Sequence, residues 1–212
     1  MKCTNLVIAL TKGRILKETL PLLAAANIEP VEDITQSRKL LFDTNLDNIK
    51  LMVVRGSDVP TYVEFGSADM GVAGKDLILE HGSDGFYEPL DLRIAKCRLM
   101  TAEPMVPSST SDTLKVATKF TNIAKKYFAE QGQQVELIKL NGALELAPSL
   151  GLADLIVDIV ETGQTLTANR MEPRDLIANV SSRVVVNKAS MKIKNVIIRD
   201  ILRKLNSAVN KS

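Results

Sequence analysis

Residues 155–166 read Leu-Ile-Val-Asp-Ile-Val-Glu-Thr-Gly-Gln-Thr-Leu, an apolar run that passes into a short polar stretch with one glycine. The pattern predicts a buried strand, a loop and the start of a helix. Such a turn presents unpaired backbone N–H groups at the positive end of a helix dipole, which favours a phosphate group. Gly163 permits an unusual backbone angle, and Thr162 and Thr165 add hydroxyl donors. A capped helix that binds nothing is the alternative interpretation.

An acidic residue, Asp158, interrupts the apolar run. A charge is not buried in such a strand without a partner. Side chains alternate along a strand, so Asp154 and Asp158 are expected on the same face. Two carboxylates just before a phosphate loop favour ribose hydroxyls and, directly or through water, a Mg²⁺ ion on a pyrophosphate. A helix cap or a hidden salt bridge is the alternative, but the pattern favours a phosphoribosyl site.

Strand and helix patterns alternate along the rest of the chain. This alternation predicts an α/β protein with parallel sheets that carry helices on both faces. The expected strands are 6–10, 51–54, 69–73, 92–101 and 182–187, and the expected helices are 15–26, 58–66, 75–80 and 195–209.

A weak internal repeat links the two halves of the sequence. Residues 7–12 resemble 114–119, and residues 58–69 resemble 145–154. In the second pair, a short helix with an early proline ends at glycine, and Ala-Asp introduces a strand. Chance likeness is the alternative. A genuine repeat predicts two similar α/β lobes with a ligand cleft between them.

The predicted boundaries follow from this repeat. We expect lobe one, the ATP and pyrophosphate side, to comprise residues 1–90 plus 182–212. Lobe two, with the phosphate loop, is expected to comprise residues 91–181, and two strands are expected to join the lobes.

Basic residues follow two of the predicted strands in lobe one. Lys12, Gly13 and Arg14 come after the first strand, and Arg55 comes after the strand at 51–54. Loops at the carboxyl ends of parallel strands line the ligand crevice of open α/β sheets. Lysine and arginine there suit a polyphosphate, although solvated surface charge is the alternative for any one of them.

The composition excludes several classes of protein. The chain of 212 residues has a net charge of +2, and no apolar stretch approaches the ~18 residues of a membrane span. Cys3 and Cys97 are far apart, which suits a reducing cytoplasm. A single histidine argues against zinc. No P-loop, no dinucleotide fingerprint and no nucleophile with a partner base is visible. We therefore expect a cytoplasmic globular protein without nucleic acid or membrane partners.

Residues 145–166 read Glu-Leu-Ala-Pro-Ser-Leu-Gly-Leu-Ala-Asp-Leu-Ile-Val-Asp-Ile-Val-Glu-Thr-Gly-Gln-Thr-Leu, which closely resembles the signature of ATP phosphoribosyltransferases. Residues 9–14, 55–64, 68–76 and 141–145 resemble further motifs of that family, so the resemblance covers nearly the whole chain. It implies a fold like that of type II periplasmic binding proteins. Thr11 and Gly56 depart from the usual pattern, but neither carries a charge on which the assignment depends.

The resemblance also implies a set of substrate-binding residues. Residues 161–165 would hold the 5-phosphate of phosphoribosyl pyrophosphate, and Asp154 would contact its ribose. Lys12, Arg14, Arg55 and Asp154 would position the reacting groups. The implied binding residues are Lys12, Gly13, Arg14, Arg55, Asp69, Gly71 and Gly74 in lobe one, and Glu145, Asp154, Asp158, Glu161, Thr162, Gly163, Gln164 and Thr165 in lobe two.

The implied reaction is attack of N1 of ATP on C1 of the ribose, with departure of pyrophosphate. The adenine ring is the nucleophile, so no protein nucleophile is needed, and Mg²⁺ is expected to bind mainly through the pyrophosphate. The length matches the short form of the family. Short forms work in a hetero-oligomer, expected here to contain a catalytic dimer, with a separate regulatory subunit that resembles histidyl-tRNA synthetase.

Two other functions compete with this interpretation. A solute-binding or sensor protein would use the same cleft without chemistry. A purine-salvage phosphoribosyltransferase also uses an acidic strand and a Thr-Gly loop. Its loop normally carries two adjacent acidic residues, whereas Asp158 is followed by Ile159.

Overall fold

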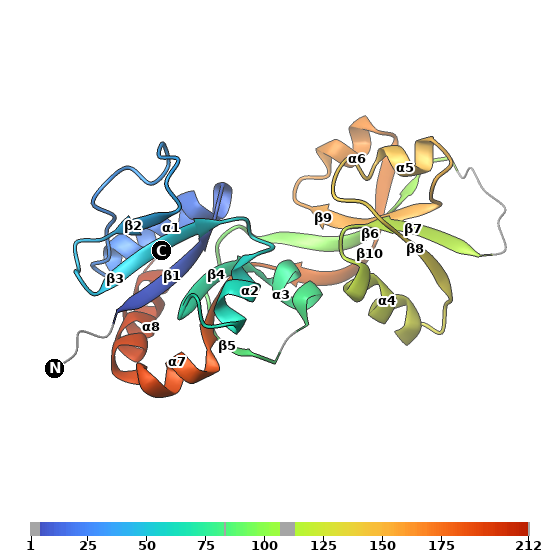
Figure 1. Ribbon diagram of the computed structural model, residues 1–212. Helices are drawn as coiled ribbons and strands as arrows, with labels where there is room; N and C mark the ends of the chain where they lie inside the picture. The colour runs from blue at the N-terminus through green and yellow to red at the C-terminus, as the bar shows by residue number, and fades with distance from the viewer. Residues whose placement is uncertain (1–4, 83, 107–112, 212) are drawn as a thin grey trace. The chain divides into compact units, whose positions relative to one another are not determined.

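A computed structural model describes residues 5–82, 84–106 and 113–211. Cys3, one of the two cysteines expected as isolated thiols, lies outside these ranges. The chain forms two compact units. Unit one contains Met1–Ala95 and Ser181–Ser212, and unit two contains Lys96–Val180. The first and last described elements of the chain therefore belong to unit one, where Figure 1 draws the first strand in blue and the last helix in red.

The sheet of unit one has the order β2-β3-β1-β4-β11-β5. The strands are β1 (Leu6–Thr11), β2 (Leu41–Asp43), β3 (Ile49–Val54), β4 (Met70–Gly74), β5 (Phe86–Asp91) and β11 (Ser182–Asn187). The central strands β3, β1 and β4 are parallel, whereas β2 and β11 run antiparallel to their neighbours. The prediction of parallel sheets is therefore wrong in detail, because the sheet is mixed. Strand β2 turns back along β3, and β11 enters the sheet in the opposite direction after the chain has passed through unit two.

Helices cover both faces of this sheet. They are α1 (Arg14–Ala25), α2 (Val59–Glu64), α3 (Lys75–His81), α7 (Lys188–Ile193) and α8 (Asn195–Val209). Leu6, Ile8 and Leu10 of β1 pack in the core that α1 and α8 cover, while Ala9 packs in a second core with Val59 of α2. The alternation of β1 side chains thus assigns α1 and α8 to one face and α2 to the other. Figure 1 shows α8 beneath β1 in this unit.

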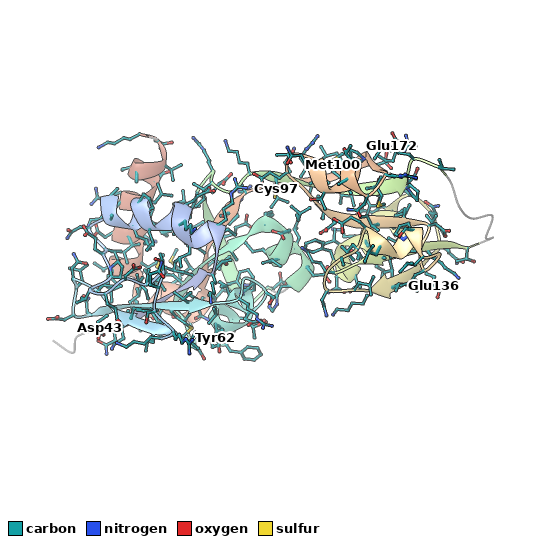
Figure 2. The ribbon with its side chains drawn as sticks, turned by 90° about the horizontal axis from the view of Figure 1, so that it is seen from above. Asp43, Tyr62, Cys97, Met100, Glu136 and Glu172 are labelled. Carbon is teal, nitrogen blue, oxygen red and sulfur yellow. The ribbon has the colours of Figure 1, made fainter. Side chains whose placement is uncertain are left out.

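Unit two has a smaller sheet, with the order β10-β6-β9-β7-β8. Its strands are β6 (Cys97–Pro104), β7 (Leu114–Thr118), β8 (Val135–Lys139), β9 (Leu155–Val160) and β10 (Met171–Val180). Strands β8, β7 and β9 are parallel, and β6 is antiparallel to both β9 and β10. Figure 2 shows Glu172 of β10 and Glu136 of β8 at opposite edges of the sheet. The helices are α4 (Thr121–Glu130), α5 (Leu146–Ser149) and α6 (Gln164–Ala168).

The strand predicted at 92–101 begins late. Arg93 and Ala95 have φ angles of 57° and 49°, in the left-handed region that interrupts a strand. The extended segment therefore starts at Cys97 and continues to Pro104 as β6.

The internal repeat is visible in the structure. The hydroxyl of Thr11 donates to the backbone of the neighbouring strand β4 at 2.8 Å, and that of Thr118 donates to β9 at 2.7 Å. The glycines that follow the short helices α2 and α5, Gly66 and Gly151, have φ angles of 72° and 71°. Each unit therefore contains the same strand, short helix and parallel strand. No helix in the described ranges has the length and apolar character needed to cross a bilayer.

Candidate active site

The loop between β9 and α6 has the form that the sequence predicts. Gly163 lies at the amino end of α6 with φ 80° and ψ −2°, a left-handed conformation in which an L side chain is strained. No atom lies within 4 Å of the place where a β-carbon would be. The open space beside Gly163 lets a ligand approach the backbone closely. Because α6 has only five residues, its dipole is small, and the N–H and hydroxyl groups are the main donors.

A hollow of about 310 Å³ lies against this loop, within unit two. We call it the loop hollow. It combines three carboxylates with the threonine hydroxyls of the loop. Its lining residues are Glu145, Asp158, Ile159, Val160, Glu161, Thr162, Gly163, Thr165 and Leu166. Of the residues predicted for unit two, Gln164 and Asp154 are not part of the lining.

Asp158 lies on β9 opposite Met100 of β6. The Nζ atom of Lys119 is 3.3 Å from Oδ1 of Asp158, close enough for an ion pair. Oδ1 is fully buried and has no hydrogen-bond partner, so the contact with Lys119 is an ion pair without hydrogen-bond geometry. Lys119 was not among the predicted site residues. The repeat contained the signal, since Lys119 corresponds to Lys12.

Asp154 does not reach the loop hollow. It precedes β9, and its Oδ2 atom accepts a hydrogen bond from the backbone N–H of Lys115 at 2.7 Å. The prediction treated Asp154 and Asp158 as neighbours because they share a strand face. Four residues of strand span about 13 Å, so sharing a face does not bring them to one ligand. The structure thus places Asp154 at the start of the strand and Asp158 beside the loop.

In unit one, the predicted cations gather at one edge of the sheet. Lys12 follows β1 and its backbone N–H donates to the last carbonyl of β3 at 2.9 Å, and Arg55 follows β3 directly. Gly13 has φ 98° and immediately precedes α1. The Nε atom of Arg14 lies 2.6 Å from Oε1 of Glu18, one turn along the helix. We call Lys12, Arg14 and Arg55 the basic edge.

A second hollow, of about 290 Å³, adjoins the basic edge within unit one. Four of its lining residues carry positive charge: Lys12, Lys17, Arg38 and Lys39. Arg38 and Lys39 were missed because a Ser-Arg-Lys stretch before a strand is indistinguishable in sequence from a solvated turn. The other lining residues are Gly13, Leu16, Ile34, Thr35, Ser37, Leu40 and Val53. We call this the basic hollow.

Two other residues predicted in unit one serve the fold. Asp69 is 5% exposed and lies at the amino end of β4, where it accepts hydrogen bonds from Ser190 at 2.6 Å and Lys194 at 2.9 Å. A β-carbon on Gly71 would come within 2.6 Å of Val59, so this glycine allows α2 to pack on the sheet. The structure thus places neither residue at the basic edge.

Gly74 is the one predicted residue of β4 that lies at the carboxyl end of the strand, where α3 begins. A β-carbon there would lie 2.2 Å from Oδ1 of Asp76. Rotation of the Asp76 side chain would relieve that contact, and Gly74 has an ordinary extended φ of −64°, so the backbone there does not require a glycine.

Comparison with known proteins decides what these sites belong to. A family model described as ATP phosphoribosyltransferase matches residues 55–207, which is most of the chain. The chain belongs to the ATP phosphoribosyltransferase family. It is therefore a pentosyltransferase that acts at the first step of histidine biosynthesis, and the family implied by the sequence resemblance is confirmed.

Individual members of the ATP phosphoribosyltransferase family are closely similar. The enzyme of Saccharophagus degradans is 65% identical over 207 residues, covering 98% of this chain and 97% of the relative. The enzyme of Chromohalobacter salexigens is 61% identical over 205 residues, covering 97% and 95%. Neither rival interpretation, the sensor or the purine-salvage enzyme, is compatible with this membership.

A solved structure agrees with the fold. The ATP phosphoribosyl transferase (HisG:HisZ) complex from Thermotoga maritima matches with a TM-score of 0.86 and 32% identity. The match covers 98% of this chain and 100% of that one. The predicted fold class, two α/β lobes like those of type II periplasmic binding proteins, is confirmed.

Proposed function

We propose that the loop hollow binds the phosphoribosyl part of phosphoribosyl pyrophosphate in the reaction that gives phosphoribosyl-ATP and pyrophosphate. The supporting observation is that the hollow contains both the loop around Gly163 and a carboxylate, Asp158, on the preceding strand. The loop offers hydrogen-bond donors to a phosphate. Thr162, Thr165 and the loop N–H groups would hold the 5-phosphate. Asp158 would accept hydrogen bonds from the ribose hydroxyls.

The basic edge and the basic hollow would bind the phosphates of ATP or the leaving pyrophosphate. Lys12, Arg14 and Arg55 supply fixed positive charge at adjacent strand ends, and Arg38 adds a planar fork suited to phosphate oxygens. Cations placed where negative charge develops lower the barrier for departure of pyrophosphate.

No protein nucleophile takes part in the proposed mechanism. N1 of the adenine forms a bond to C1 of the ribose while the bond from C1 to the pyrophosphate oxygen breaks. The ribose is cation-like at that point, and the carboxylates of the loop hollow stabilise positive charge. Catalysis is then mainly orientation of two bound substrates, combined with stabilisation of the leaving group.

The residues of the loop hollow suit Mg²⁺ as an ion that the substrate carries. Glu145, Asp158 and Glu161 offer carboxylate oxygens, which Mg²⁺ prefers. No group of three His, Cys, Asp or Glu side chains within the described ranges is placed to hold a metal by itself. We propose that Mg²⁺ binds the pyrophosphate, with Asp158 and Glu161 as candidate protein ligands. When bound, the ion would neutralise charge on the leaving pyrophosphate.

We propose that this catalytic chain works with a regulatory subunit resembling histidyl-tRNA synthetase, in a hetero-oligomer that contains a catalytic dimer. The similar Thermotoga maritima structure is a HisG:HisZ complex, and the match covers that chain completely. We also place the enzyme in the cytoplasm, because two isolated cysteines suit a reducing compartment.

The test is release of pyrophosphate from phosphoribosyl pyrophosphate with Mg²⁺, with and without ATP and the regulatory subunit. We expect release that depends on ATP, with phosphoribosyl-ATP identified by mass. Asp158→Asn should lower kcat/KM for phosphoribosyl pyrophosphate by at least about 100-fold, since it weakens a charge-assisted contact to the ribose. Asp43→Asn, an exposed change on the edge strand β2, is the matched control and should have no effect. An Asp158→Asn enzyme as active as the wild type would contradict the assigned site.

A further inference from the structure

We infer that Lys119 is a positioning residue that orients Asp158 for phosphoribosyl pyrophosphate. This inference rests on the proposed function of the loop hollow. It adds a role for a lysine that lines neither hollow and was not among the predicted site residues.

The backbone brings Lys119 to Asp158. Strands β7 and β9 are parallel neighbours, and Thr118 at the end of β7 lies in register with Val157. Lys119, the residue after β7, therefore lies beside Asp158, the residue of β9 that follows Val157. The Lys119 ammonium lies 4.7 Å from the centre of the Phe120 ring, and Phe120 is 1% exposed. A buried aromatic ring thus holds the ammonium beside the carboxylate.

The two oxygens of Asp158 have different surroundings. Oδ1 is fully buried without a hydrogen bond, and the Lys119 ammonium at 3.3 Å is the countercharge that the structure gives it. A buried carboxylate oxygen without compensation is unfavourable. The side chain is nevertheless 24% exposed, so its exposed part lies away from Oδ1. Lys119 therefore holds Oδ1 in its inward position. The other oxygen, Oδ2, then faces the loop hollow that Asp158 lines.

The repeat shows what is special about this pair. Thr11 and Thr118 make the same hydroxyl contact to the adjacent strand, so Lys12 and Lys119 occupy equivalent positions. In unit one, the residue equivalent to Asp158 is Ala73, and Lys12 lines the basic hollow directly. In unit two the lysine instead faces a carboxylate. The same backbone position thus carries a lysine proposed to contact substrate in unit one and a lysine proposed to orient a substrate-binding carboxylate in unit two.

The test compares Lys119→Met and Lys119→Arg with Lys126→Met as the matched control. Lys126 is 79% exposed, lies on α4 of the same unit and pairs with Glu130. Assays use the complex with the regulatory subunit. For Lys119→Met we expect a KM for phosphoribosyl pyrophosphate raised about tenfold, the size of one lost contact to a charged group. The KM for ATP should change less than about twofold, because a misoriented Asp158 weakens contacts to phosphoribosyl pyrophosphate only. The value of kcat should fall, because Asp158 is one of the carboxylates proposed to stabilise the cation-like ribose. Lys119→Arg should restore most of the affinity, and Lys126→Met should match the wild type.

A double-mutant cycle decides whether Lys119 acts through Asp158. In an Asp158→Asn background, Lys119→Met should have little further effect on binding of phosphoribosyl pyrophosphate, measured by calorimetry without turnover. The inference is overturned if Lys119→Met weakens binding of phosphoribosyl pyrophosphate as much in the Asp158→Asn background as in the wild type. Equal increases in the KM for phosphoribosyl pyrophosphate and the KM for ATP also overturn it. So does a Lys119→Met enzyme with unchanged KM. Wild-type protein that binds phosphoribosyl pyrophosphate but makes no phosphoribosyl-ATP would refute the proposed function alone, because calorimetry still tests Lys119. Wild-type protein that binds none would overturn both.

Discussion

The side chain of Asp154 accepts a hydrogen bond from the backbone N–H of Lys115 at 2.7 Å, and its own backbone N–H donates to the carbonyl of Lys115 at 2.8 Å. Asp69 makes the same pair of contacts with Val7 in unit one, at 2.9 Å each. In both units, an aspartate thus joins the starts of two parallel strands. The recurrence of this contact indicates a structural role for Asp154.

Changing Asp154 should affect stability more than catalysis. Asp154→Ala removes the acceptor for the Lys115 N–H and should lower the free energy of unfolding by about 1–3 kcal/mol, the range for such a hydrogen bond. Asp154→Asn keeps an acceptor oxygen and should cost less. Urea denaturation measures both, and the KM for phosphoribosyl pyrophosphate should stay within about twofold of the wild type. A large rise in KM for a stably folded Asp154→Asn enzyme would restore the predicted contact to the ribose.

The sequence predicted the elements better than their directions. The helix expected at 195–209 coincides with α8, and the expected strand before the phosphate loop coincides with β9. Local periodicity contains that information, since it depends on neighbours in the chain. The directions of β11 and β6 depend on where a distant segment re-enters a sheet, so periodicity does not reveal them.

The site was predicted in part for a related reason. The phosphate loop and the basic edge follow strands directly, and position after a strand is readable from sequence. Loop packing brings Arg38 to the basic hollow, and sheet pairing brings Lys119 to Asp158. Neither approach follows from the local sequence. Their charges look solvated in the sequence. Asp154 shows a different limit of the sequence, because strand alternation gives the face on which a residue lies but not its position along the strand.

Removal of the Asp69 carboxylate should destabilise unit one. This nearly buried group accepts from Ser190, Lys194 and the Val7 N–H. Its loss removes the countercharge of the Lys194 ammonium, which keeps a hydrogen bond to the Asn5 carbonyl. Asp69→Ala should lower the free energy of unfolding by about 3 kcal/mol. Asp43→Ala removes an exposed partner of Lys50 and should cost less than about 1 kcal/mol. Urea denaturation compares the two. Similar small effects would show that the Asp69 cluster does not stabilise the unit.

Comparison of Gly163→Ala with a control glycine should distinguish the effect of backbone strain on stability from the effect of an added methyl group on substrate binding. The alanine would adopt φ near 80°, which costs roughly 1–2 kcal/mol, and its methyl group would occupy the space beside the phosphate loop. Gly132→Ala is the matched control, since Gly132 has φ 71° and equally open surroundings in unit two. Both variants should lose similar stability in urea. Only Gly163→Ala should weaken binding of phosphoribosyl pyrophosphate, by about tenfold or more. Equal binding by the two variants would argue against the phosphate loop.

The stability of the chain in acid should depend on Glu18. The hydrogen bond from the Arg14 side chain lowers the pKa of Glu18 below 4.5, and the N–H of Ala95 acts in the same direction, against partial burial. A carboxyl with a lowered folded pKa stabilises the fold above its unfolded pKa, and this contribution is lost as pH falls through the folded pKa. Glu18→Gln removes the titrating charge and retains an acceptor for Ala95. Its stability should therefore fall less than that of the wild type between about pH 5 and pH 3. Thermal melts across that range measure the difference, with Glu29→Gln as a control for net charge. A Glu18→Gln variant that loses as much stability in acid as the wild type would show that the contact with Arg14 contributes nothing in solution.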